Sequence, residues 1–305
     1  MWVRDAYLSP VQRLGLGYVR AGVYAPGGRH LAAWPLFASK DSVFNRPQRR
    51  LTAPAGAYRL EAPTIYGGAF YPGFCHFLTE TLPNLIALGP ARAAYPEARI
   101  VMHAPEPVDL PRVARTAHGA FFFGLLGVDP GRIDLVTRPL VATDLFLPEP
   151  AFATGLRPAP HLPALVDAAF ATIVPEGPEQ VYFSRLRWTR KGDRVIGEAR
   201  VQAQFAEAGY TPVHMQELPL HEQLALARAA VRIAGPQGTA LHWSLFGPKT
   251  RGVICLGWRS RLQEGICAVR GQHYRNLKGL PPNPFRPRAR RLAEATIAKC
   301  LRREV

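Results

Sequence analysis

The second half of the chain alternates between short apolar runs and amphipathic stretches, a pattern typical of a doubly wound α/β domain. The expected strands are residues 181–183, 211–214, 231–234 and 253–256, and the expected helices are 198–208, 220–230 and 238–246. Right-handed crossovers between parallel strands bring the loops that follow the strands to one edge of the sheet. Because ligands bind at that edge, the residues just after each strand are the first candidates for a binding site.

The first half of the chain is less regular. We expect residues 1–62 to be irregular, with short strands and turns. Apolar residues at helical spacing predict a helix over 74–88, in which Pro83 introduces a kink or a new start. The other predicted elements are strands at 100–102, 135–136 and 145–147 and a helix over 111–126.

A segment rich in proline and small residues divides the chain. It covers residues 148–163, and a helix predicted over 162–172 leads from it into the second half. A chain of 305 residues is long enough for two domains of ordinary size. We predict an amino-terminal domain over residues 1–172 and a carboxy-terminal domain over 173–305.

The composition disfavours several classes of protein. Hydrophobic residues make up 48% of the chain, which is enough for a sizeable core. No apolar run approaches the roughly 18 residues of a membrane-spanning helix, and the first residues lack the pattern of a secretory signal, so a cytoplasmic protein is expected. The four cysteines are widely separated, and no pair has the spacing of a zinc or redox site.

The formal net charge of +16 is ambiguous. Nucleic acid, an anionic membrane surface and phosphorylated substrates are all partners for a basic protein. A composition rich in Arg, Ala and Pro is also typical of a GC-rich genome, so charge by itself identifies no function. The basic tail at 286–305 suits contact with a membrane surface or packing against the amino-terminal domain, and we favour packing.

The first candidate site is the loop 234–241, between a predicted strand and a predicted helix. Gly235, Gln237, Gly238 and Thr239 make this loop a place where a ligand approaches the backbone and where N–H groups attract a diphosphate. The alternative is an ordinary turn whose glycines allow close packing. The loop matches neither the dinucleotide-binding motif nor the Walker motif.

A basic segment follows the first strand of the same predicted sheet and therefore reaches the same edge. It contains Ser184, Arg185 and Arg194, and arginine side chains bind phosphates in bidentate fashion. The alternative is a solvated basic loop. Glu217, just after the next strand, is a candidate for holding ribose hydroxyls, whereas Glu222 better fits a charge at a helix amino terminus.

In the first half, His76 and Glu80 are four residues apart on one face of a predicted helix. A histidine oriented by a carboxylate is suited to act as a general base, and the alternative is an amphipathic helix with one polar pair. The sequence contains no Asp-x-Asp and no Gly-x-Ser-x-Gly, which disfavours a metal-dependent transferase and an α/β-hydrolase. No nucleic-acid-binding module is visible.

Taken together, these segments resemble glycosyltransferase family 61, including its members from bacterial capsular and exopolysaccharide biosynthesis. Three motifs match in the family's order: Gly73 to Pro83 with His76 and Glu80, then Ser184-Arg185 followed by Arg194 and Glu198, and last Glu222-Gln223 followed by Gly235 to Thr239. The resemblance covers roughly residues 66–257.

The resemblance implies a GT-B-like fold, with two Rossmann-like domains facing each other across a cleft. It also implies an inverting, metal-independent transfer of a hexosyl or pentosyl group from a nucleotide-sugar to a glycan or lipid-linked acceptor. The nucleotide-sugar is a co-substrate, and no cofactor or metal is expected. This function accords with a cytoplasmic location. It also allows peripheral contact with the inner membrane and requires no nucleic-acid partner.

An inverting transfer requires one base and a stabilised leaving diphosphate, and this requirement assigns roles to the candidate residues. His76 is the base, with Glu80 orienting it or acting in its place. Arg185, Arg194 and the loop 235–239 neutralise the leaving diphosphate, and Glu217 holds the ribose.

Three positions depart from the family pattern. The family's loop histidine is Gln237, its asparagine before a helix is Gly197, and a later asparagine is Trp243. The departures at Gln237 and Trp243 leave a second hypothesis open, a non-catalytic family member that binds a glycan or organises a polysaccharide assembly. A nucleic-acid-binding protein is the third hypothesis, and it rests on charge.

Overall fold

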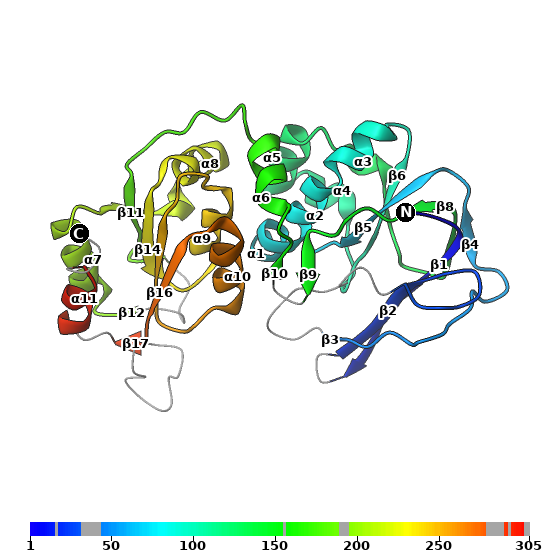
Figure 1. Ribbon diagram of the computed structural model, residues 1–305, viewed down its shortest axis with the longest axis horizontal. Helices are drawn as coiled ribbons and strands as arrows, with labels where there is room; N and C mark the ends of the chain where they lie inside the picture. The colour runs from blue at the N-terminus through cyan, green and yellow to red at the C-terminus, as the bar shows by residue number, and fades with distance from the viewer. Residues whose placement is uncertain are drawn as a thin grey trace. The chain divides into compact units, whose positions relative to one another are not determined.

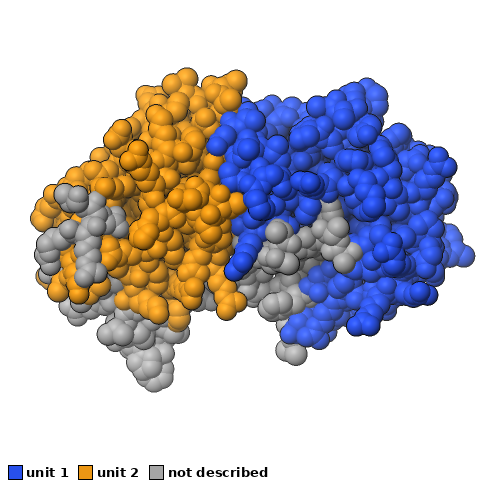
Figure 2. Space-filling model, in the orientation of Figure 1, with its two compact units in different colours: residues 1–169 blue, residues 170–305 orange. Residues whose placement is uncertain are grey.

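The computed structural model describes residues 1–15, 18–31, 44–154, 157–188, 195–278, 290–291 and 294–301. The chain forms two compact units, unit 1 over Met1–Ala169 and unit 2 over Phe170–Val305 (Figures 1 and 2). This division falls close to the domain boundary at residues 172 and 173 that the sequence predicts. Both units combine helices with parallel strands, so the chain has the expected α/β class.

Unit 2 is built on a five-stranded parallel sheet with the strand order β13-β11-β14-β15-β16. Its strands are β11 (Gln180–Phe183), β13 (Thr211–Val213), β14 (Arg232–Pro236), β15 (Gly252–Leu256) and β16 (His273–Leu277). Its helices are α7 (Glu198–Glu207), α8 (Leu220–Ala229), α9 (Thr239–His242), α10 (Arg261–Arg270) and α11 (Glu294–Leu301), with 3-10 turns η3 (Met215–Glu217) and η4 (Trp243–Phe246). Each strand and helix predicted within residues 181–256 is present.

Two elements of unit 2, α10 and β16, are not predicted from the sequence. The helix α10 begins at Ser260, whose hydroxyl accepts a hydrogen bond from the N–H of Gln263, and ends at Gly271 in the left-handed conformation. Because α10 has few apolar residues, its helical periodicity is weak, and the capping residues Ser260 and Gly271 did not by themselves predict a helix. The strand β16 lies at the edge of the sheet and has mostly half-exposed residues, so it has no apolar run.

The strand order of unit 2 contains a point where the direction of winding reverses. From β11 the chain passes through α7 to β13 on one side of β11, and then through α8 to β14 on the other side. In open α/β sheets, the crevice at the carboxyl ends of two such strands is the usual place for a ligand. The loops after β11 and β14 therefore occupy the favoured position in this unit.

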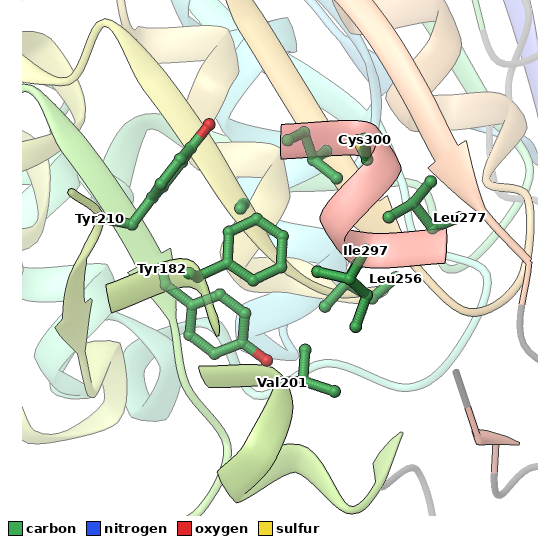
Figure 3. Packing of buried hydrophobic residues seen from close by; sticks show 10 residues of the cluster. Tyr182, Val201, Tyr210, Leu256, Leu277, Ile297 and Cys300 are labelled. Atoms are coloured by element: carbon green, nitrogen blue, oxygen red, sulfur yellow. The ribbon is translucent and has the colours of Figure 1, made fainter. Parts of the chain in front are cut away.

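One apolar core of unit 2 lies on the sheet face that α7 and α11 cover (Figure 3). It contains three aromatic residues, together with aliphatic residues and a cysteine from α7, from three strands and from α11: Tyr182, Val201, Phe205, Tyr210, Ala234, Ile254, Leu256, Leu277, Ile297 and Cys300. Ile297, Cys300 and Leu301 of the basic tail, for which we expected a partner in the amino-terminal domain, thus pack within unit 2. Leu292, also an apolar residue of the tail, lies outside the described residues.

Unit 1 contains a mixed sheet with the strand order β3-β2-β1-β8-β5-β6-β7, and β4 pairs with β8. Its strands are β1 (Trp2–Gly15), β2 (Tyr18–Tyr24), β3 (Phe44–Asn45), β4 (Tyr58–Leu60), β5 (Thr64–Ala69), β6 (Arg99–His103), β7 (Ile133–Leu135) and β8 (Leu140–Phe146). The run from β8 through β5 and β6 to β7 is parallel, whereas β1 is antiparallel to both of its neighbours. The strands predicted at 100–102, 135–136 and 145–147 overlap β6, β7 and β8.

The expectation that residues 1–62 are irregular is wrong for β1 and β2. The strand β1 has 14 residues and lies between β2 and β8. Pro10 argues against a central strand because it cannot donate a hydrogen bond to its neighbour. In the structure Pro10 falls where the pairing of β1 with β2 shifts register, between Ser9 and Gln12, so it interrupts the ladder at a bulge.

The remaining elements of unit 1 are mostly short helices. They are α1 (Phe74–His76), the π-helical turn η1 (Phe77–Thr81), α2 (Leu82–Ala87), α3 (Gly89–Ala94), α4 (Leu110–Ala114), α5 (Ala117–Leu125), the 3-10 turn η2 (Pro130–Arg132) and α6 (Leu162–Ala169). The helix predicted over 111–126 is divided at Thr116, whose hydroxyl caps α5. Two small sheets, β9 (Phe152–Thr154) with β10 (Arg157–Pro158) and β12 (Val195–Ile196) with β17 (Arg290–Arg291), complete the description. Among the described residues, no helix is long and apolar enough to cross a membrane.

The packing of α11 on unit 2 is open to a stability test. Ile297 is fully buried in the core of unit 2, so Ile297→Ala is expected to reduce the free energy of unfolding by about 2–4 kcal/mol. Lys299 is exposed on the same helix, and Lys299→Ala is expected to change it by less than about 0.5 kcal/mol. Denaturant titrations of the two variants make the comparison, and equal effects would show that α11 is not part of the core.

Candidate functional site

The loops after β11 and β14 meet at the point where the winding of unit 2 reverses. The guanidinium of Arg185 donates a hydrogen bond from Nη2 to the carbonyl oxygen of Gln237 over 2.6 Å. A Cβ atom added to Gly238 would lie 1.8 Å from the same nitrogen, and Gly238 has φ 153° and ψ −172°, a conformation that favours glycine. The cationic segment and the glycine loop therefore converge, and the convergence requires glycine at 238.

Gly235 has a different function from Gly238. A Cβ atom at 235 would lie 2.8 Å from the carbonyl oxygen of Phe183, on the neighbouring strand β11. Close packing between strands therefore accounts for this glycine, as the alternative interpretation of the loop supposed. The N–H of Gln237 donates to the carbonyl oxygen of Leu256 over 2.9 Å, which fixes the loop to the end of β15. Thr239 follows as the first residue of α9.

A buried carboxylate holds the backbone at Arg185. Glu198, at the start of α7, is almost completely buried, and its Oε1 accepts a hydrogen bond from the Arg185 N–H over 2.7 Å. Its position in the first turn of α7 is favourable because the helix dipole stabilises negative charge there. Burial, and then the charge of Glu198, raise the pKa of Tyr182. Glu198 is part of the second motif, but no role was predicted for it. The signal in the sequence that could have indicated its role is its position directly after Gly197, at the start of a predicted helix.

Ser184 is also buried, and its hydroxyl oxygen accepts a hydrogen bond from the N–H of Leu186 over 3.2 Å. The side chain thus stabilises the turn that carries Arg185. A direct contact with a donor remains a prediction for Ser184, as for the other candidates in this loop. Arg194 lies outside the described residues.

Glu217 lies on the far side of β11 from the glycine loop, at the end of η3. Its Oε2 accepts a hydrogen bond from Nη1 of Arg187 over 2.8 Å, and both side chains are largely exposed. This ion pair connects the loops after β11 and β13. A ribose hydroxyl that binds the carboxylate of Glu217 would therefore either share this carboxylate with Arg187 or replace Arg187 as its partner.

In unit 1, His76 and Glu80 form the predicted pair, with 2.7 Å between Nδ1 of the ring and Oε1 of the carboxylate. The side chain of Glu80 is 4% exposed, whereas that of His76 is 47% exposed. A buried carboxylate that binds one nitrogen of a half-exposed imidazole fixes its orientation and stabilises its protonated form. We call this pair the dyad.

The helix predicted over 74–88, which carries the dyad, forms in three parts. Between α1 and α2 it widens into the π-helical turn η1, in which the N–H of Leu82 bonds to the carbonyl oxygen of Phe77. Pro83 has no N–H with which to continue the α-helical pattern, and it lies in the first turn of α2, so it marks the new start that the sequence offers as one of its two outcomes. Single π-helical turns are frequent at functional sites because they redirect side chains.

Among the described residues, no group of three His, Cys, Asp or Glu side chains is arranged to hold a metal ion. Of the candidate residues, the structure brings His76 together with Glu80 in unit 1, and Arg185 together with Gln237 and Gly238 in unit 2.

Comparison with protein families identifies the class to which these two sites belong. The family described as Glycosyltransferase 61 matches residues 74–254, a range that begins just before the dyad and ends in β15. The chain therefore belongs to this family, and the family implies glycosyltransferase activity with a sugar donor and an acceptor. The comparison with curated proteins found no match.

Two departures from the family pattern now have structural descriptions. Gln237 contributes its carbonyl oxygen to Arg185 and its N–H to Leu256, both of which are backbone contacts. Trp243 is buried and packs against Phe246, with 5.4 Å between ring centroids. The tryptophan is therefore part of the interior beneath α9.

The close approach of Arg185 to Gly238 is testable by substitution. Gly238→Ala is expected to displace the guanidinium and to reduce the free energy of unfolding by about 1–3 kcal/mol, because the added methyl group occupies its position in a conformation that is strained for alanine. Gly252→Ala, where the added atom would meet ordinary contacts, is the matched control within the same unit. Denaturant titration measures both, and a Gly238→Ala protein as stable as the control would contradict the described convergence.

Proposed function

We propose that this member of the Glycosyltransferase 61 family transfers a sugar from a nucleotide-sugar to a glycan or lipid-linked acceptor in polysaccharide biosynthesis, with inversion and without a metal. The observation that carries this proposal is the contact of Arg185 with the Gln237–Gly238 loop at the switch point of a parallel sheet. The proposal includes the GT-B architecture, a cytoplasmic location, and no cofactor besides the nucleotide-sugar.

In this proposal, unit 2 binds the donor through its diphosphate. The Arg185 guanidinium is held by one of its five N–H groups to Gln237, and its planar shape suits bidentate contact with a phosphate. Gly238 leaves the backbone accessible beside it. As the glycosidic bond breaks, negative charge grows on the leaving diphosphate, and a fixed cation stabilises that charge without reorganisation. Arg194 adds a second cation, and Glu217 binds the ribose.

Unit 1 supplies the base. The acceptor hydroxyl attacks the anomeric carbon from the side opposite the diphosphate, so one bond forms as the other breaks and the configuration inverts. His76 accepts the hydroxyl proton, and the buried carboxylate of Glu80 stabilises the resulting imidazolium. The nucleoside diphosphate then leaves as the second product.

A second candidate function is a family member that binds a donor or glycan without turnover. The substitution of a family histidine by Gln237 favours it, because this residue lies at the proposed diphosphate site. Incubation with uridine, guanosine, cytidine and thymidine diphosphate sugars distinguishes the two: release of nucleoside diphosphate supports the transferase, and binding without release supports the second candidate. Absence of both binding and release would overturn the donor site.

The role of Arg185 predicts a defect in binding. Arg185→Ala is expected to weaken the affinity for the nucleoside diphosphate of the active donor by at least about tenfold, the usual value of a hydrogen bond to a charged group. Arg59, an exposed arginine that is paired with Asp5 in unit 1, provides the control. Calorimetric titration is the measurement, and equal affinities in Arg185→Ala and Arg59→Ala would refute the assigned role.

The role of His76 predicts a defect in turnover. His76→Ala is expected to lower kcat by about 100- to 10,000-fold, the range for loss of a general base, while the affinity for nucleoside diphosphate stays within about twofold. His273→Ala, which removes an exposed imidazole from β16, is the control. If kcat of His76→Ala stays within a few-fold of the wild-type value, another residue must be the base.

A further inference from the structure

A buried tyrosine lies against the dyad. The ring of Tyr71 stacks on the imidazole of His76, with 5.2 Å between ring centroids and 30° between planes. Tyr71 is only 5% exposed, and it lies just beyond the end of β5. The imidazole therefore has an aromatic surface beside one face and the Glu80 carboxylate at Nδ1.

The hydroxyl of Tyr71 interacts with the second member of the dyad. Burial first, and then the charges of Glu80 and Glu106, raise the pKa of Tyr71. The hydroxyl thus remains protonated at physiological pH, and its oxygen and Oε2 of Glu80 are both buried. A buried carboxylate needs hydrogen-bond donors, because its desolvation is costly when its oxygens are not hydrogen-bonded.

The backbone of Tyr71 is fixed by the same π-helical turn that carries Glu80. The N–H of Tyr71 donates to Oγ1 of Thr81 over 2.7 Å, and this hydroxyl donates to the carbonyl oxygen of Tyr71 over 3.1 Å. In an α-helix, positions 76, 80 and 81 would not share one face. Across the wider turn between 77 and 81, His76 and Thr81 both contact Tyr71, and the charge of Glu80 acts on its hydroxyl.

We propose that Tyr71 is a positioning residue for the dyad. Its ring restricts the imidazole of His76 to one orientation, and its hydroxyl holds the carboxylate of Glu80 in line with Nδ1. Nδ1 then carries the proton of the neutral imidazole, and Nε2 is the atom that accepts the proton of the acceptor. The inference rests on the proposed function for its catalytic meaning, but its structural content is measurable without turnover.

Other polar groups near the dyad belong to separate contacts. Glu106 acts on Tyr71 through its charge. His118 lies on α5 against the rings of Phe74 and Phe77, and its Nε2 is 2.9 Å from the carbonyl oxygen of Pro72. Burial lowers the pKa of His118, so this imidazole is neutral at physiological pH.

The test is the tautomer of His76, read from its imidazole 15N chemical shifts in the full chain at a pH where the ring is neutral. The wild-type protein is expected to hold the proton on Nδ1, facing Glu80. Tyr71→Phe keeps the ring but removes the hydroxyl, so a substantial Nε2–H population is expected. Tyr71→Leu removes the ring as well and is expected to give a larger population of the Nε2–H tautomer. Glu80→Gln removes the charged acceptor and provides the reference for a lost dyad.

Tyr66→Phe is the matched control. Tyr66 is a fully buried tyrosine on β5 whose hydroxyl is 2.9 Å from Nδ1 of another histidine, His103. This variant is expected to lose stability but to keep the wild-type tautomer of His76. If turnover is found, Tyr71→Phe should lower kcat about tenfold or more with the donor KM unchanged, because misplacing a catalytic group slows the chemical step.

The outcomes separate this inference from the proposed function. A wild-type tautomer in Tyr71→Phe, or a wild-type protein with the proton on Nε2, overturns the positioning role whether or not any sugar is transferred. Failure of every donor to bind or react overturns the proposed function, while the tautomer still decides the role of Tyr71. A tautomer change in Tyr66→Phe equal to that in Tyr71→Phe would show a general effect of lost stability and would also refute the role.

Discussion

The bond between the Arg185 guanidinium and the carbonyl oxygen of Gln237 is the contact on which the account of unit 2 depends. It joins two loops that are about fifty residues apart in sequence and that belong to neighbouring parallel strands. Three local features support it. Gly238 leaves space for the guanidinium, Glu198 holds the backbone of Arg185, and the N–H of Gln237 is bonded to the end of β15. A cation fixed in this way at a topological switch point is preorganised for a phosphate.

The dyad in unit 1 depends on a different constraint, the π-helical turn before Pro83. Because this turn is wider than an α-helical turn, it places Glu80 in the interior while His76 stays half exposed. The carboxylate of Glu80 is therefore buried, while the imidazole that it contacts stays accessible. This combination is what a base requires, since the imidazolium must be stabilised where a proton donor can reach it.

Much of unit 2 could be predicted from the sequence because its apolar runs are short, buried and bounded by ordinary helix signals. The convergence of Arg185 and Gly238 followed from the rule that parallel strands share a carboxyl edge. The burial of Glu198 and Tyr71 could not be predicted in the same way, because it depends on tertiary packing rather than on spacing. In unit 1, Pro10 argued against the strand β1, and the π-helical turn that precedes the predicted new start at Pro83 had no signal in the sequence. The strong periodicity of 74–88 still gave the pairing of His76 with Glu80 correctly.

The apolar residues of the basic tail illustrate a further limit. Their spacing predicted a buried face but contained no information about the partner, which is the core of unit 2 around Phe205. Sequence periodicity identifies a face to be covered, and only the fold identifies what covers it.

A crystal structure of the protein bound to a nucleoside diphosphate tests the central claim most directly. The account expects the diphosphate within hydrogen-bonding distance of the Arg185 guanidinium and beside the backbone at Gly238. A nucleotide bound elsewhere, with Arg185 still attached to Gln237 and remote from every phosphate oxygen, would contradict it.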